Sequence, residues 1–122
     1  MSFLHVRCGI FLTALLVSCP SWSSGIEDST PAQRAALQTS FMKDQLKLDA
    51  SKLSKVDAIN RKYAEESEPV LKGSGGLFEK RSKMQTIMDA KDKELKQVLN
   101  DEEFSRYNEI KGDIKSYLES HL

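Results

Sequence analysis

Two groups of carboxylates are the first candidates for chemistry in this sequence. Three glutamates lie at Glu65, Glu66 and Glu68, and Asp101–Glu103 is an unbroken acidic run. Paired carboxylates act as general acid and base when a pocket shifts their pKa values. Both groups fall at the ends of expected helices, where the helix dipole explains acidic residues in a first turn. The sequence has no Ser-His-Asp set, phosphate loop or cofactor fingerprint, so we predict a protein that is not an enzyme and uses no cofactor.

Metal binding is the second chemistry to consider. Met84 and Met88 lie one helical turn apart, and two thioethers suit a soft copper(I) ion. A third ligand is not evident, because His121 is one residue from the end of the sequence. We therefore assign no metal-ligating residues, and a metal-sensing or metal-sequestering protein is kept as an alternative.

Residues 1–23 resemble a secretory signal peptide. Arg7 gives a short polar start, and Cys8–Cys19 is an apolar run that is too short to span a membrane. Pro20 then breaks the segment, and Ser21–Ser23 offers small residues for cleavage. The pattern predicts a periplasmic protein whose mature chain has no cysteine, because both cysteines lie in the signal.

A competing interpretation makes the protein a lipoprotein. Leu16–Cys19 resembles a lipobox, in which Cys19 would be lipidated and would become the first residue of the mature chain. Pro20 argues against lipidation. Membrane attachment is expected only if Cys19 is lipidated.

The charge balance excludes a nucleic-acid footprint. The chain has 18 basic and 18 acidic residues, and removing the signal segment with Arg7 leaves one acidic residue in excess. Nucleic-acid binding needs a basic excess on one face. Charged residues make up 30% of the chain and aromatic residues only 7%, a balance that favours a helical protein with large solvated faces.

Apolar periodicity predicts an all-α, elongated four-helix bundle that resembles a hairpin. Residues 24–30 are expected to be a disordered leader and residues 31–122 the helical domain, with helices near 31–47, 50–68, 77–99 and 101–118. Pro69 is expected to end or kink the second helix. The glycine-rich stretch 72–76 is the expected hairpin tip. In the third helix Leu77, Met84, Met88, Leu95 and Val98 form a near-heptad stripe, which Lys91 interrupts.

Two helix starts share one pattern. Asn100 and Glu103 predict a capping box, and Leu99 can pack on Phe104 as a hydrophobic staple. An earlier copy lies 51 residues before it, with Asp49 as the cap. That copy lacks the reciprocal acid, because lysine occupies position 52.

These two starts resemble the paired LTxxQ motifs of the Spy/CpxP family of periplasmic proteins. The matching segments are Leu48–Lys52 and Leu99–Glu103, and the resemblance covers about Phe41 to Tyr117. Both segments depart from the motif, since Asp49 and Asn100 replace its threonine and position 52 and Glu103 replace its glutamine.

The resemblance implies a function. Family members form helical hairpins that often pair as dimers. Some hold unfolding proteins without ATP, some damp envelope-stress signalling, and related proteins bind metals. We therefore expect a holding chaperone of the periplasmic envelope-stress response, a homodimer, with unfolded periplasmic proteins as clients and an envelope-stress sensor as a further partner. A structural or scaffold lipoprotein is also kept open.

An open helical hairpin is too thin to bury all its apolar side chains. Five residues are candidates for a partly exposed surface that binds clients or partners: Leu37, Phe41, Met42, Met84 and Met88. Methionine suits adaptable binding because its side chain is flexible and polarizable. The competing interpretation places each of them in the core or in a dimer seam.

Overall fold

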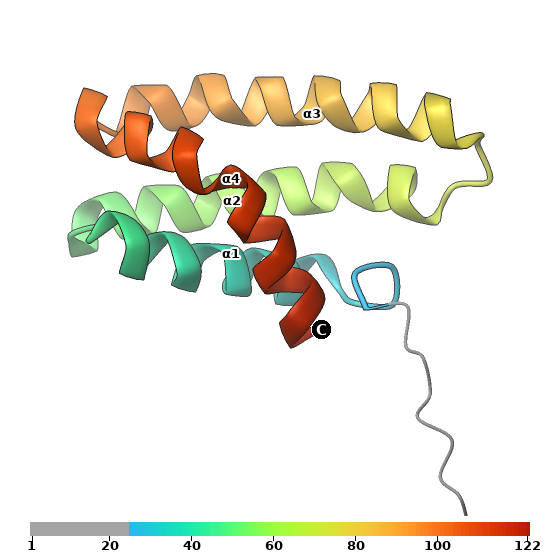
Figure 1. The fold of residues 1–122 in the computed structure, drawn as a ribbon, viewed down its shortest axis with the longest axis horizontal. Coiled ribbons are helices and arrows are strands. Elements are labelled where there is room, and N and C mark those ends of the chain that lie inside the picture. The colour runs from blue at the N-terminus through green and yellow to red at the C-terminus, as the bar shows by residue number, and fades with distance from the viewer. Residues whose placement is uncertain (1–24) are drawn as a thin grey trace, which may run out of the picture.

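Four helices make up the part of the chain that the structure describes, residues 25–122, and this part contains no strand. In this computed structural model the helices are α1 (Pro31–Leu46), α2 (Ala50–Lys72), α3 (Leu77–Val98) and α4 (Asp101–His121). The predicted all-α bundle is therefore confirmed (Figure 1). The predicted signal peptide, with both cysteines, lies outside the described residues.

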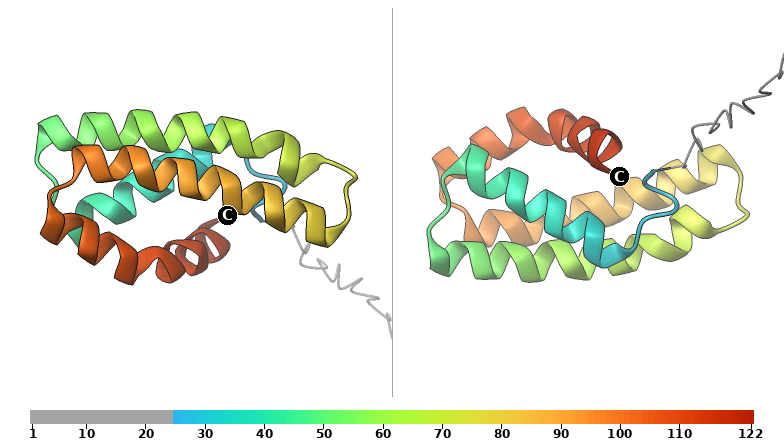
Figure 2. Two further views of the ribbon diagram at one scale, coloured as in Figure 1. Left: turned by 90° about the horizontal axis from the view of Figure 1, so that it is seen from above. Right: turned by 90° about the horizontal axis from the view of Figure 1, so that it is seen from below.

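The helices form two hairpins that share α2, and α4 then closes part of the bundle. α1 packs on α2, and α2 packs on α3. α4 starts beside the end of α3 but crosses to the opposite side, where it packs on α1 (Figures 1 and 2). α3 and α4 make few contacts, and α1 and α3 do not pack directly on each other.

The core follows the predicted apolar stripes. Met42, Val56 and Leu95 are fully buried at its centre. The remaining buried members are Leu46, Leu48, Ile59, Tyr63, Leu99, Tyr107, Ile114 and Leu118. One polar residue, Asn60, is also fully buried and donates from its side chain to Thr39 Oγ1 at 3.0 Å. Apolar burial from all four helices therefore holds the bundle together.

The helix restart at Asn100 is confirmed in atomic detail. Asn100 Oδ1 accepts a hydrogen bond from the Glu103 amide at 2.8 Å, and Glu103 Oε1 accepts one from the Asn100 amide at 3.0 Å. Leu99 is buried, and Phe104 packs against the same core cluster. The chain thus leaves α3 and enters α4 with both ends of the capping box satisfied.

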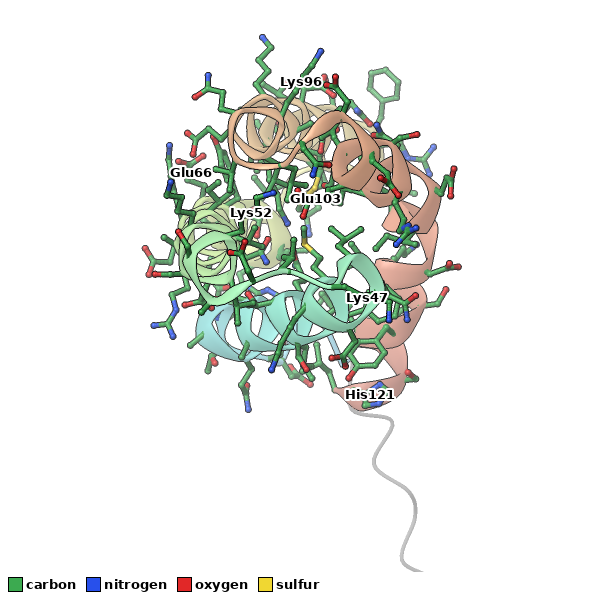
Figure 3. The ribbon with its side chains drawn as sticks, turned by 90° about the vertical axis from the view of Figure 1, so that its left-hand side faces the viewer. Lys47, Lys52, Glu66, Lys96, Glu103 and His121 are labelled. Carbon is green, nitrogen blue, oxygen red and sulfur yellow. The ribbon has the colours of Figure 1, made fainter. Side chains whose placement is uncertain are left out.

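The earlier helix start is tied to the later one by Lys52. Asp49 Oδ1 accepts from the Lys52 amide at 2.8 Å, which confirms the predicted cap. The Lys52 ammonium lies 2.5 Å from Glu103 Oε1, so the two equivalent positions of the repeated pattern form an ion pair (Figure 3). Burial would raise the pKa of Glu103, but the hydrogen bonds from Lys52 and from the Asn100 amide lower it overall.

Part of the expected leader forms a turn before α1. Residues 25–29 form a turn in which the Ser29 amide donates to the Gly25 carbonyl at 3.1 Å. The buried Arg34 donates to the Ser29 carbonyl at 2.7 Å and to the Ile26 carbonyl at 3.2 Å. The local sequence pattern does not predict this turn, because the turn depends on hydrogen bonds from a single arginine on α1.

The ends of two helices and the exposure of one apolar residue also differ from the sequence prediction. α2 does not end at Pro69 but continues to Lys72, with the proline inside its last turns. α4 extends to His121, whose ring stacks on Tyr117 with centroids 3.9 Å apart. Leu77, assigned to the apolar stripe of the third helix, is 76% exposed, because α2 is the only helix beside this end of α3 (Figure 1).

Replacing Asn100 with alanine tests the cap. Asn100→Ala should lower the free energy of unfolding by about 0.5–2 kcal/mol, because the Glu103 amide loses its acceptor. Urea denaturation followed by circular dichroism measures the change. The matched control is Asn108→Ala, an exposed position within α4, which should change stability by less than about 0.5 kcal/mol. Equal effects of the two substitutions would contradict the capping role.

A double-mutant cycle tests the ion pair between the two helix starts. Glu103→Gln keeps an acceptor for the capping box, and Lys52→Met removes the cation. We expect a coupling of about 0.5–1 kcal/mol at neutral pH. Because folding lowers the pKa of Glu103, this contribution is present above the unfolded pKa of about 4.3 and is lost as the pH falls through the folded pKa. A coupling that persists at about pH 2 would contradict the assignment.

Candidate functional site

A cavity of about 450 Å³ opens between α3 and α4 and reaches to α1 and α2. Its size falls within the range of about 300–1,000 Å³ that is typical of ligand sites. Most of the lining surface is apolar, although polar and charged residues outnumber apolar ones around the cavity. The aliphatic and thioether side chains that line it are Ile26, Leu71, Met84, Met88, Ile114 and Leu118. The cavity is partly open to solvent.

The path of α4 creates this space. α4 moves away from α3 after Asn100 and packs on α1, so the first half of α3 has only α2 beside it (Figure 2). Met84 and Met88 on α3 therefore face Ile114 and Leu118 on α4 across a gap that no helix fills. At the opposite end of the bundle, where α3 connects to α4, buried core residues fill the interior.

Lys91 is the most unusual residue in the cavity wall. It lies on α3 and is only 3% exposed, and its ammonium crosses the interior to donate to Gln38 Oε1 on α1. Among the described residues no carboxylate forms an ion pair with it. Burial lowers the pKa of Lys91 to about 8, a shift that the Asp92 charge opposes and the Lys111 charge reinforces.

The neighbouring acid is already engaged. Asp92 forms an ion pair with Lys111 and accepts from the Tyr107 hydroxyl at 2.8 Å. Burial, together with the charge and hydrogen bond of Asp92, raises the pKa of Tyr107 above its ordinary range. The negative charge nearest to Lys91 is therefore compensated by another cation.

The lining carries a net positive charge. Its described ionisable residues are four cations (Arg34, Lys91, Lys111 and Lys115) and two carboxylates (Asp89 and Asp92), with Tyr107 protonated at neutral pH. Three of these cations form ion pairs with Glu68, Asp92 and Glu119, so Lys91 is the buried cation of the lining without a carboxylate partner among the described residues.

The structure separates the five candidate residues predicted from the sequence. Met84 and Met88 are half-buried and line the cavity together. Leu37 and Phe41 lie on α1 against the core, and the Phe41 ring packs on Tyr117 with centroids 4.9 Å apart. Met42 has no exposed surface. Its assignment to a partly exposed surface is wrong, because its face of α1 points at α2.

Lys91 is not among the candidate residues predicted from the sequence. It interrupts the apolar stripe of the third helix, although Met84, Met88, Leu95 and Val98 place it at a core position of the heptad pattern. A lysine at such a position must be buried or must displace the helix. The heptad spacing of the apolar residues could therefore have indicated that this lysine is buried.

The carboxylates considered for catalysis serve structural roles or face solvent. Glu68 forms ion pairs with Arg34 and Lys72, which hold its pKa below the usual range. Glu65 and Glu66 are exposed. Within residues 25–122 no group of three or more His, Cys, Asp or Glu side chains is arranged to hold a metal ion.

No protein-family model, curated protein or solved structure matches this chain. The similarity to the Spy/CpxP family therefore stays a prediction that rests on the two helix starts. None of the helices between residues 25 and 122 combines the length and the hydropathy that crossing a bilayer requires.

Replacing Lys91 with methionine should stabilise the protein. A buried lysine whose pKa falls from 10.5 to about 8 is destabilised at pH 7 by roughly 3 kcal/mol relative to the unfolded chain. Lys91→Met removes that penalty but leaves Gln38 without its donor, so we expect a net gain of about 1–3 kcal/mol. Urea denaturation at pH 7 measures it.

The gain should depend on pH in one direction. Between about pH 8 and 10.5 the unfolded wild-type chain binds more protons than the folded chain, so wild-type stability rises with pH and its gap to Lys91→Met narrows. The exposed neighbour Lys93 provides the control, since Lys93→Met should change stability by less than about 0.5 kcal/mol at every pH. A constant gap would contradict the buried charge.

Proposed function

We propose that this chain is a periplasmic protein of the envelope-stress response that acts as an ATP-independent holding chaperone. One observation carries the proposal: an apolar cavity, lined by Met84 and Met88, lies open between two helices that do not close on each other. The resemblance of the two capped helix starts to the LTxxQ motifs adds support.

The physical basis of holding is reversible burial of apolar surface. An unfolding protein exposes apolar segments, and covering them is favourable by about 25 cal/mol per Å². Met84 and Met88 can adapt to different side chains because they are unbranched and flexible. Such binding needs no nucleotide, since release follows when the client folds and withdraws its apolar segments.

A second apolar surface lies at the far end of the bundle. Leu77 and Phe78, in the first turn of α3, are 76% and 86% exposed. They follow the connector at 73–76, well away from the capped end (Figure 1). In the proposed function this tip provides either an additional contact for long clients or a seam for the expected homodimer.

An aggregation assay tests the proposal. The purified protein, without ATP, should suppress light scattering by a thermally unfolding client enzyme at a few-fold molar excess. Met84→Gln combined with Met88→Gln keeps side-chain length and removes apolar surface, so we expect the apparent affinity for the client to fall by about tenfold. Gln97→Glu, exposed on α3 and outside the cavity, is the matched control and should leave suppression intact.

Two outcomes would count against this assignment. Absence of suppression at several-fold excess of the wild-type protein would argue against a holding chaperone. Full suppression by the double methionine variant, with loss of suppression in Phe78→Ser, would move client binding from the cavity to the tip of α3.

A further inference from the structure

We propose that the cavity between α3 and α4 binds a single-chain amphiphile with a carboxylate head, of the fatty-acid type, and that the Lys91 ammonium holds the head group. This inference concerns a small ligand and does not depend on the proposed holding activity. It rests on the position of one buried cation at the inner side of an apolar space.

The walls suit an acyl chain. Leu71 from α2, Met84 and Met88 from α3, and Ile114 and Leu118 from α4 line the space with aliphatic and thioether groups. Its volume of about 450 Å³ is in the range of sites that enclose a small ligand. Since the cavity is partly open to solvent, a chain can enter between the two helices.

Lys91 lacks the partner that a buried cation needs. An ammonium group has three donors, and Lys91 uses one of them on the neutral Gln38 side chain. Asp92, the adjacent acid, is paired with Lys111. Buried charges in proteins are normally paired or bound to an ion, so a ligand carboxylate would supply the missing negative charge and accept the free donors.

A second polar group at the wall is also unsatisfied. Arg34 lines the cavity, and its Nε is buried without a hydrogen-bond partner. The other nitrogens of this guanidinium are engaged, with Ile26, Ser29 and Ala64 carbonyls and with Glu68. Two residues from different helices therefore contribute incompletely used donors to the lining: Lys91 on α3, which donates only to Gln38, and Arg34 on α1, whose Nε has no acceptor.

The charge of the lining selects among ligand classes. Arg34, Lys111 and Lys115 each pair with a carboxylate, whereas Lys91 meets only the Gln38 amide oxygen. The uncompensated charge at the wall is therefore positive, which disfavours a metal cation and favours an anion. The predominantly apolar walls disfavour a free phosphate or a nucleotide, which would leave the aliphatic surface exposed to water. An anion joined to an apolar tail satisfies both parts of the cavity at once.

Isothermal titration calorimetry with laurate and with 1-dodecanol tests the assignment. The two probes have the same chain length and differ in the charge of the head. We expect the purified protein to bind one laurate per chain, with a Kd in the micromolar range. Lys91→Met should weaken laurate binding by at least about tenfold and leave 1-dodecanol binding within about threefold. Circular dichroism confirms that the variant is folded.

Lys93→Met is the matched control, because Lys93 is exposed on the same helix and does not line the cavity. It should bind both probes as the wild type does. The proposal is overturned if wild-type protein shows no laurate binding at about 100 μM, if laurate binds with many molecules per chain, or if Lys91→Met leaves laurate binding unchanged. Equal weakening of both probes would also overturn it, because Lys91 would then not recognise charge.

Discussion

The reciprocal cap at Asn100 is the interaction on which the rest of the structure depends. It ends α3, starts α4 after two residues outside either helix, and satisfies the amides of Asn100 and Glu103. Glu103 also receives the Lys52 ammonium, so the start of α4 is fixed to the start of α2. Because the direction of α4 is set there, the helix crosses to α1 and does not return along α3. The gap between α3 and α4 is therefore a consequence of how the restart is held.

Lys91 shows that this gap is used differently from an ordinary core. A heptad position in a closed bundle is filled by an apolar side chain, because a buried charge is unfavourable. At position 91 the chain places a lysine whose pKa is lowered by burial and whose ammonium meets only an amide oxygen. Natural proteins tolerate such local losses of stability mainly at functional sites. The same residue that weakens the bundle is therefore the reason for proposing its inner wall as a binding surface.

Local sequence patterns predicted the helices well because their causes are local. The caps at Asp49 and Asn100 depend on residues three positions apart, and the apolar stripes depend on helical periodicity. The ion pair between Lys52 and Glu103 could not be derived in this way, since the two residues meet only when the folded bundle brings the starts of α2 and α4 close together. The ordered turn before α1 also depends on a distant partner, the Arg34 side chain that is anchored on α2 through Glu68.

The candidate site was predicted only in part, for the same reason. Met84 and Met88 share a helical face, so the sequence could place them together, whereas Met42 was misplaced because periodicity does not tell which helix covers a given face. The cavity arises from the divergence of α3 and α4, and this tertiary arrangement has no signature in either helix alone. The sequence showed that Lys91 interrupts the apolar stripe. Its hydrogen bond to Gln38 could not be predicted, because it depends on how α1 and α3 are placed in the folded bundle.

The cavity has an apolar surface and a buried cation, and this combination affects the binding free energy of both proposed occupants. A ligand that binds the folded chain and not the unfolded chain stabilises it by RT ln(1 + [L]/Kd). An anion at Lys91 would have a lower Kd, because its binding removes part of the penalty of a buried, unpaired ammonium. An apolar polypeptide segment would use Met84 and Met88 but would leave that ammonium uncompensated. Since both proposed occupants need the same apolar surface, a bound amphiphile and a bound client would exclude each other, and the charge at position 91 would decide which of them the cavity favours.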